Sequence, residues 1–179
     1  NIRPYHFGIH QVVLVGMGGS AIGGAYVADL IADEAKCPYI VCNSYTVPAY
    51  VDKHTLVIVS SYSGNTEESI SALEMALTRD AKVVCMSSGG KLKAIADRKD
   101  LDFIALPSGW PSPRACVGYS IVCQLFVLYH LGLISKTVIE NVKIASDLLL
   151  FEQEDIISKA DKLADVIVKH LPVIYTSDR

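Results

Sequence analysis

The most constraining stretch of this sequence is an apolar run that ends in a serine-rich turn, VIVSSYSGNTEE at residues 57–68. An uninterrupted apolar run is typical of a strand that is buried on both faces, and helical sequence follows the turn directly. The turn brings the hydroxyls of Ser61, Ser63 and Thr66 to a helix N-terminus, where backbone N–H groups lack partners. It therefore predicts a site for an anion, with phosphate as the best candidate. A helix cap needs only one hydroxyl, so any one of the three could instead be a cap.

The same succession of strand, turn and helix recurs along the chain. We expect strands at 11–15, 38–42, 55–60, 82–86 and 102–106, with helices at 21–35, 65–79 and 91–97. Alternating helices and apolar strands call for a parallel sheet that is covered on both faces, so the expected fold is an α/β, three-layer αβα sandwich. Ligands bind at the carboxyl ends of the strands in such sheets. The turns after the first and third strands should therefore share one rim.

The turn after the first strand also matches a dinucleotide-binding pattern. Residues 16–21 read GMGGSA, which satisfies G-x-G-x-x-G/A. The pattern needs an acidic residue at the end of the second strand, but residues 42–44 are CNS, and Asp33 and Glu34 fall in the preceding helix. A nicotinamide site is weakened but stays open, as does a purely structural role for the glycines in a tight turn.

Charge and cysteine usage narrow the possible partners and compartment. The net charge of −3 gives no basic footprint, so nucleic acid is not expected as a partner. The five cysteines form no CxxC pair and lie in apolar runs, which indicates buried free thiols in a reducing compartment, here the cytoplasm, with a metal site as the alternative. No signal-peptide pattern is visible at the start. These cysteines are Cys37, Cys42, Cys85, Cys116 and Cys123.

The uncharged segment 115–134 approaches the length of a membrane span. Gly118, Ser120 and Gln124 interrupt it, so we expect no membrane span but a helix buried in the core or in a subunit interface. Helices at 137–149 and 154–170 should follow, and the end of the chain resembles the opening strand. We therefore expect the chain to be a fragment, with one domain at 1–153 and a linker helix and first strand of a second domain at 154–179.

Several single residues have both a functional and a structural interpretation. Arg114 lies between a proline-rich loop and the apolar helix, where an unpaired buried charge would be costly. It could stabilise an anionic intermediate or form a structural salt bridge. His54, His130 and His170 lack a paired carboxylate or a metal-ligand spacing, so we expect structural roles for them. Trp110 could line the rim or fill the loop.

Three motifs together resemble a known family. They are GGSAIGG at 18–24, SYSGNTEE at 61–68, and PRA with GY within 113–119. From about Val12 to about Leu133 the chain resembles a sugar isomerase (SIS) domain. Within that superfamily it is similar to the first half of the bifunctional phosphoglucose/phosphomannose isomerases.

The resemblance implies a five-stranded sheet of flavodoxin-like order that pairs with a second such domain, usually in a homodimer. It also implies interconversion of glucose 6-phosphate or mannose 6-phosphate with fructose 6-phosphate, without a metal or other cofactor. Arg114 would contact the substrate and act in catalysis by stabilising the enediolate formed during proton transfer between C1 and C2. The other implied substrate contacts are Ser61, Ser63 and Thr66 for the phosphate, and Gly19 and Ser20 for the sugar.

One part of the family pattern has no counterpart in this chain. The glutamate base, the ring-opening histidine and a lysine of the family lie in or beyond the second domain. Glu67 and Glu68 cannot replace the base, because they belong to the helix that follows the binding loop. We expect the chain alone to bind hexose phosphate weakly or not at all and not to isomerise it. A non-catalytic sensor of phosphosugars is the alternative from another class, and a nicotinamide-binding domain is a third.

Overall fold

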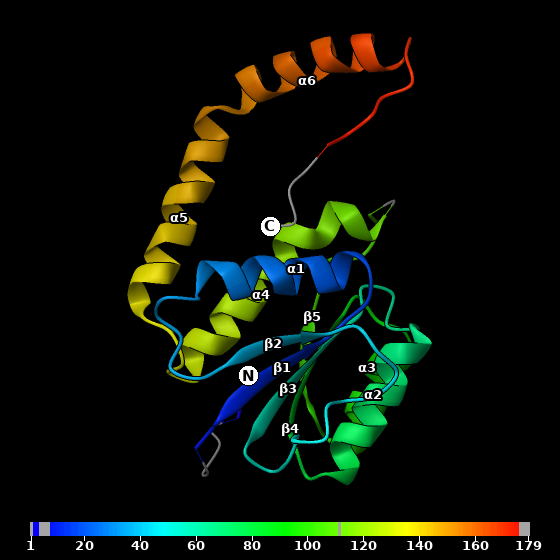
Figure 1. Cartoon of the computed structure of the whole chain (residues 1–179), viewed down its shortest axis with the longest axis vertical. Coiled ribbons are helices and arrows are strands. Elements are labelled where there is room, and N and C mark those ends of the chain that lie inside the picture. Colours follow the sequence, from blue (N-terminus) through cyan, green and yellow to red (C-terminus); the bar gives the residue numbers. More distant parts are fainter. Residues whose placement is uncertain (1, 4–7, 111, 176–179) are drawn as a thin grey trace. The chain divides into compact units, whose positions relative to one another are not determined.

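The computed structural model of the chain describes residues 2–3, 8–110 and 112–175. Five strands alternate with helices over the first two thirds of the chain, and helices make up the rest (Figure 1). The elements in order are β1 (Gln11–Val15), α1 (Gly19–Leu30), β2 (Tyr39–Cys42), β3 (Thr55–Ser60), α2 (Glu67–Thr78), β4 (Lys82–Ser87), α3 (Gly90–Lys99), β5 (Asp102–Ala105), the 3₁₀ turn η1 (Pro113–Cys116), α4 (Val117–His130), α5 (Lys136–Phe151) and α6 (Gln153–Ile167).

All neighbouring strands of the sheet are parallel, in the order β2-β1-β3-β4-β5. Helices α1 and α4 pack beside each other on one face, and α2 and α3 cover the other (Figure 1). The predicted α/β sandwich with a five-stranded parallel sheet is therefore confirmed. From β1 the chain continues to β2 on one side of the sheet, whereas β3, β4 and β5 follow one another on the other side. The strand order therefore reverses between β1 and β3.

The central strands form the core because their side chains are covered on both faces. Every residue of β3 is buried, as are the four residues 12–15 of β1. Helix α1 comes close to this core through Gly24, since a Cβ at that position would lie 1.8 Å from Cδ2 of Leu14. Gly24, which has no Cβ, thus permits close packing of α1 on the sheet.

The predicted strands agree with the structure to within one residue, but two helices differ from expectation. Helix α1 ends at Leu30 and not at residue 35, because the chain beyond it turns towards the end of α4. There, the carboxylate of Glu34 accepts hydrogen bonds from the backbone and side chain of Ser135, at 3.2 and 2.8 Å. The apolar segment 115–134 is a 3₁₀ turn followed by α4, which ends before Gly132, a glycine at φ +71°.

The chain divides into two compact units, residues 1–139 and 140–179. The first contains the whole sheet and the helices that cover it. In the second, the described residues of the expected final strand, 171–175, have no regular structure and are exposed. No residue of α5 or α6 is buried.

Candidate functional site

The rim at the carboxyl ends of β1 and β3 carries the predicted site. The register pairs Val15 with Val59, so the two strands end side by side. The glycine turn at 16–18 and the serine loop at 61–66 therefore start from adjacent points of the sheet. Strand order also reverses here, which is where ligands bind in sheets of this kind.

The serine loop draws two of its three hydroxyls together. The Oγ of Ser61 lies 2.9 Å from Oγ1 of Thr66, and Ser61 is buried. Thr66 occupies the N-cap position of α2, yet its side chain makes no capping hydrogen bond. The Oγ of Ser63 accepts a hydrogen bond from the backbone N–H of Asn65 at 3.2 Å, and Ser63 is exposed. The capping alternative is therefore wrong for Thr66, whose hydroxyl contacts Ser61.

A second glycine loop, residues 87–90 after β4, locks the serine loop in place. Gly64 has φ +67°, and a Cβ added to it would lie 1.9 Å from the carbonyl oxygen of Gly89. The carbonyl oxygen of Gly64 accepts from the backbone N–H of Leu92 at 2.8 Å, and Oδ1 of Asn65 accepts from that of Lys91 at 3.0 Å. Gly64 is thus required by both its backbone angle and its contact.

The glycine turn after β1 meets the serine loop at a small hollow. Gly18 has φ +53° and starts α1, so the N-terminal N–H groups of that helix also face the rim. Ser20 is 9% exposed. In this hollow two of the predicted site residues, Gly19 and Ser20, lie beside Tyr62 of the serine loop. Its lining consists of Gly19, Ser20, Tyr62, Leu106, Cys116, Val117 and Ser120.

Arg114 differs from the expectation of a buried charge. It lies in η1, two residues before the buried Cys116, but Arg114 itself is exposed. Among the described residues its side chain has no hydrogen bond or ion pair, so the structural salt bridge, one of the two interpretations of the sequence, is not present there. The side chain is exposed although η1 ends in the buried Cys116. The guanidinium remains available for an anion.

A chain of buried polar side chains runs behind the rim, between α4 and the sheet. The hydroxyl of Tyr39 donates to Oε1 of Gln124, and Nε2 of Gln124 donates to Oγ of Ser120 at 2.9 Å. The Oγ of Ser120 lies 3.4 Å from that of Ser60. Gln124, Ser120 and Ser60 are all buried. The polar residues that interrupt the apolar helix are therefore internal contacts, and Ser120 also lines the hollow.

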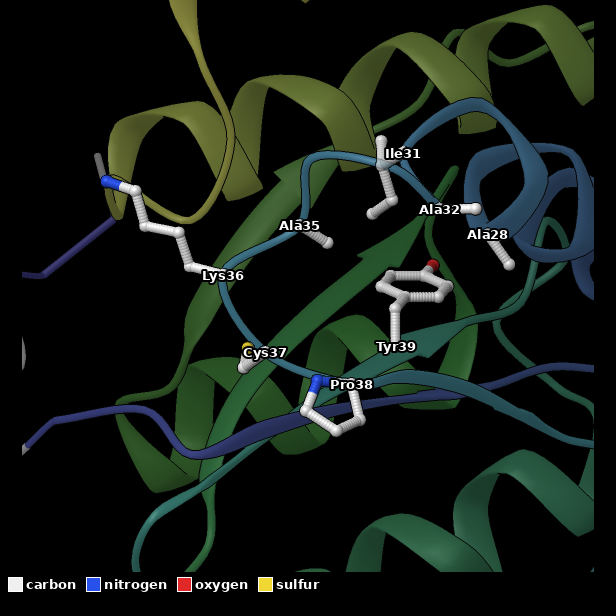
Figure 2. Close-up of a pocket in the computed structure, with 8 residues that line it drawn as sticks. All are labelled: Ala28, Ile31, Ala32, Ala35, Lys36, Cys37, Pro38 and Tyr39. Carbon is white, nitrogen blue, oxygen red and sulfur yellow. The ribbon is translucent and has the colours of Figure 1, made fainter.

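A larger pocket, of about 510 Å³, lies at the opposite edge of the sheet, where α1 ends and β2 begins. Its lining is mostly apolar, and the Lys36 side chain extends away from the Tyr39 ring (Figure 2). We take the rim as the candidate site in spite of its smaller hollow, because the hydroxyls and helix N-termini gather there. The residues around the larger pocket are Ala28, Ile31, Ala32, Ala35, Lys36, Cys37, Pro38 and Tyr39.

The three histidines singled out in the sequence have contacts that suit structural roles. The ring of His54, just before β3, stacks on that of His10, with centroids 4.5 Å apart. A ring nitrogen of His130 lies 3.1 Å from the carbonyl oxygen of Ile2, and Nδ1 of His170 lies 2.8 Å from that of Val166. Their predicted structural roles agree with these contacts.

The described part of the chain contains no group of three or more His, Cys, Asp or Glu side chains arranged to hold a metal ion. No helix within it is long and apolar enough to cross a membrane. All five cysteines are free; Cys85 and Cys116 are buried, as expected, whereas Cys37, Cys42 and Cys123 are only partly buried.

Sequence reasoning missed two contributors to the rim. The first is the glycine loop at 87–90, although its SSGG sequence repeats the strand–serine–glycine–helix pattern of the serine loop. The second is Tyr62, whose hydroxyl accepts a hydrogen bond from the backbone N–H of Trp110 at 3.2 Å. No sequence signal points to that contact, because 48 residues separate the partners.

The rim as a whole presents hydrogen-bond donors. Hydroxyls, helix N-terminal N–H groups and one guanidinium are groups that bind oxyanions, and none of them is a proton acceptor of moderate pKa. The arrangement can therefore hold a phosphate and stabilise a developing negative charge. The hydroxyls, N–H groups and guanidinium named here are not bases that could remove a proton from carbon.

A comparison with protein-family models matches residues 7–133 to the SIS domain. A bifunctional phosphoglucose/phosphomannose isomerase from Caldicellulosiruptor bescii is 43% identical over 173 residues, which are 93% of this chain and 51% of the relative. One from Aquifex aeolicus is 34% identical over 99% of this chain and 52% of the relative. The chain spans about half the length of the curated relatives it matches.

Solved structures with the same fold are more distant in sequence. A protein from Salmonella typhimurium LT2, solved as a candidate phosphosugar isomerase, has a TM-score of 0.70 at 20% identity, over 89% of this chain and 51% of the other. The C-terminal domain of glucosamine-fructose-6-phosphate aminotransferase from Francisella tularensis has a TM-score of 0.61 at 12% identity, over 88% and 48%. These likenesses support the fold assignment.

Proposed function

The chain belongs to the SIS domain family, and we propose that it is the phosphosugar-binding half of an aldose–ketose isomerase. The substrates would be glucose 6-phosphate, mannose 6-phosphate and fructose 6-phosphate, interconverted through an enediolate. The observation that carries the proposal is the pair of hydroxyls of Ser61 and Thr66, 2.9 Å apart, at the N-terminus of α2. Its relatives in Caldicellulosiruptor bescii and Aquifex aeolicus bear the name of this activity.

The serine loop would bind the phosphate. Thr66 and Ser63 offer hydroxyl donors, and the first turn of α2 adds backbone N–H groups with the positive end of the helix dipole. Because Glu67 and Glu68 lie in the first turn of α2, the phosphate would have to approach from the side of Ser63 and Thr66. Gly19 and Ser20, across the hollow, would contact the sugar.

Arg114 would act on the reacting end of the substrate. During isomerisation a base removes the proton on C1 or C2, negative charge builds on the carbonyl oxygen, and the proton returns to the neighbouring carbon. A guanidinium near that oxygen stabilises the charge. The base must lie within hydrogen-bond distance of the proton it removes, and the carboxylates of Glu67 and Glu68 belong to the phosphate end. We therefore propose that the base comes from outside these 179 residues.

An apolar stripe on α1 and α4 supports pairing with a second SIS domain, either in the same protein or in a homodimer. The two helices pack side by side. Their exposed apolar residues recur at helical spacing, so each helix keeps an apolar outer face beside its buried one. In this assignment residues 1–153 form the first domain, residues 154–179 lead to the second, and the protein acts in the cytoplasm. The stripe consists of Ile22, Tyr26 and Leu30 on α1 and Tyr119, Phe126 and Tyr129 on α4.

Turnover and binding measured side by side test the proposal. In the whole protein that carries this chain, fructose 6-phosphate should be converted to glucose 6-phosphate and mannose 6-phosphate, and Arg114→Met should lower kcat with little change in KM. The 179 residues alone should not convert it. Turnover by the chain alone, or loss of binding without loss of kcat in the Arg114 variant, would contradict these assignments.

A sensor of phosphosugars is the second candidate, because the proposed site offers hydrogen-bond donors for a phosphate and a sensor would need no catalytic base. The two candidates separate in the same experiment. A whole protein that binds fructose 6-phosphate tightly but never converts it would be a sensor, and the isomerase proposal would fail.

A further inference from the structure

We propose that Tyr62 is a positioning residue that couples the serine loop to the segment carrying Arg114. The inference rests on the proposed function, in which the serine loop holds the phosphate and Arg114 acts at the other end of the substrate. No motif assigns a role to this tyrosine. Its position within the loop, between Ser61 and Ser63, nevertheless makes it the one aromatic side chain of the phosphate site.

The backbone of Tyr62 is fixed to the glycine loop after β4. Its carbonyl oxygen accepts a hydrogen bond from the backbone N–H of Ser88 at 2.9 Å and another from Oγ of Ser88 at 2.7 Å. Because this carbonyl oxygen accepts two hydrogen bonds from the same residue, Ser88, the peptide group is held in a single orientation. The ring of Tyr62 therefore leaves the loop in a defined direction.

The side chain of Tyr62 reaches the segment on the other side of the rim. Its hydroxyl accepts the hydrogen bond from the backbone N–H of Trp110, and its side chain lines the same hollow as Cys116. Burial raises the pKa of Tyr62, so the hydroxyl stays protonated at neutral pH. Trp110 and Cys116 lie on either side of Arg114 in the sequence, so Tyr62 meets this segment both before and after the arginine.

The position of Arg114 relative to the serine loop depends on these two contacts. It shares the turn η1 with Cys116, it is exposed, and within the described residues its own side chain contacts no acceptor. The ring of Trp110 gives the segment one more contact, with Tyr119 at 6.2 Å between centroids. Because the phosphate loop and the arginine segment meet through Tyr62, a phosphate bound to the loop would be set at a fixed distance from the guanidinium. An isomerase site must match the distance between the phosphate and the oxygen that becomes negatively charged in the enediolate.

The first test needs no substrate. Trp110 is the only tryptophan in the chain, so its fluorescence reports on the segment directly. In Tyr62→Phe the hydroxyl is lost and the ring is kept, and acrylamide should quench Trp110 at least about twofold more strongly than in the wild type, because the segment loses its anchor. Tyr50→Phe, an exposed tyrosine outside the rim, is the matched control and should leave quenching unchanged. Equal quenching in wild type and Tyr62→Phe would overturn the coupling.

The second test uses the whole protein and fructose 6-phosphate. Tyr62→Phe should lower kcat by about tenfold, the equivalent of one hydrogen bond, while KM changes less than twofold, because Ser63 and Thr66 still hold the phosphate. A raised KM with unchanged kcat would mean that Tyr62 binds substrate directly, and the positioning role would be wrong. If the wild-type protein has no turnover, the proposed function fails, and the quenching result still decides whether Tyr62 anchors the segment.

Discussion

The hydroxyl oxygens of Ser61 and Thr66 lie 2.9 Å apart, although one belongs to the end of a buried strand and the other to the start of a helix. Ser61 is 3% exposed, whereas Thr66 is partly exposed. In the proposed site both hydroxyls belong to the phosphate-binding loop, with Thr66 the more accessible of the two and Ser61 in a position to orient it.

Replacement of Thr66 by valine keeps the shape of the side chain and removes this hydroxyl. We expect KM for fructose 6-phosphate in the whole protein to rise about 10- to 100-fold, since a hydrogen bond to a charged group contributes about 1.5–3 kcal/mol. Ser63→Ala should raise it as well. Thr78→Val, at the other end of the same helix, is the control and should leave KM unchanged. An unchanged KM in Thr66→Val would mean that the phosphate lies elsewhere.

The lock between the two loops predicts a large loss of stability for Gly64→Ala. A Cβ there would lie 1.9 Å from the backbone oxygen of Gly89, and the residue has φ +67°. The backbone angle alone costs about 1–2 kcal/mol in a residue with a Cβ, and moving the neighbouring loop adds to it. Gly118→Ala, in α4 with no atom within 4 Å of its Cβ, should be neutral or stabilising by up to about 1 kcal/mol. Urea unfolding of the two variants measures the difference, and equal stabilities would contradict the lock.

The features of the fold and the site that could be predicted from the sequence are those that a short, contiguous stretch of residues determines. Apolar runs mark their own strands, so β1 and β3 were predicted with their observed bounds. The serine loop and the glycine turn were found for the same reason, since each is a contiguous motif. Their convergence followed from a general property of parallel sheets, that carboxyl ends of neighbouring strands meet at one edge.

Features that depend on tertiary contacts could not be read in this way. The burial of Arg114 was predicted from apolar neighbours in sequence, but η1 turns it outward. The end of α1 at Leu30 depends on Glu34 meeting Ser135, a residue 101 positions away. Gln124 looked like an interruption in an apolar helix, whereas it is buried in a polar network. In each case a distant partner overrides the local pattern.

Stability at alkaline pH should reflect the burial of Cys85. Burial, and to a lesser extent the carboxylate of Asp102, raises the pKa of this thiol from 9.0 to about 12. Between these values the unfolded chain has lost the proton that the folded chain still binds. The free energy of unfolding should therefore fall as pH rises through this window, by up to about 1.4 kcal/mol per pH unit from this group, and be unaffected by it below pH 9. Urea unfolding of wild type and Cys85→Ala at several pH values measures it, and the slope should be smaller in the variant.

The apolar stripe on α1 and α4 predicts association through this face. Tyr26→Asp or Phe126→Asp places a charge on a surface that would be covered in a homodimer, so we expect the whole protein to shift towards monomer in sedimentation equilibrium. Both residues are exposed in the chain, so the monomer should remain folded by circular dichroism. Tyr50→Asp, equally exposed but outside the stripe, should keep the oligomeric state of the wild type. If all three variants had the same oligomeric state, the stripe would be excluded as the interface.

The hydrogen bond from Tyr39 to Gln124 allows the buried polar chain to be tested as a unit. Gln124→Leu leaves the hydroxyl of Tyr39 without its acceptor and deprives Ser120 of a donor, so we expect a loss of about 1–3 kcal/mol in unfolding free energy. Tyr39→Phe leaves Oε1 of Gln124 buried without its donor, with a similar cost.

The double variant Tyr39→Phe/Gln124→Leu removes both ends of that bond at once. No buried group is then left unsatisfied between the two positions, so the double variant should lose less than the sum of the single losses, by about 1–2 kcal/mol. Urea unfolding of the four proteins closes the cycle. Strict additivity would mean that the two side chains stabilise the fold independently. A coupling of the expected size would mean that the chain behind Ser120 holds α4 against the sheet, and with α4 the turn that carries Arg114.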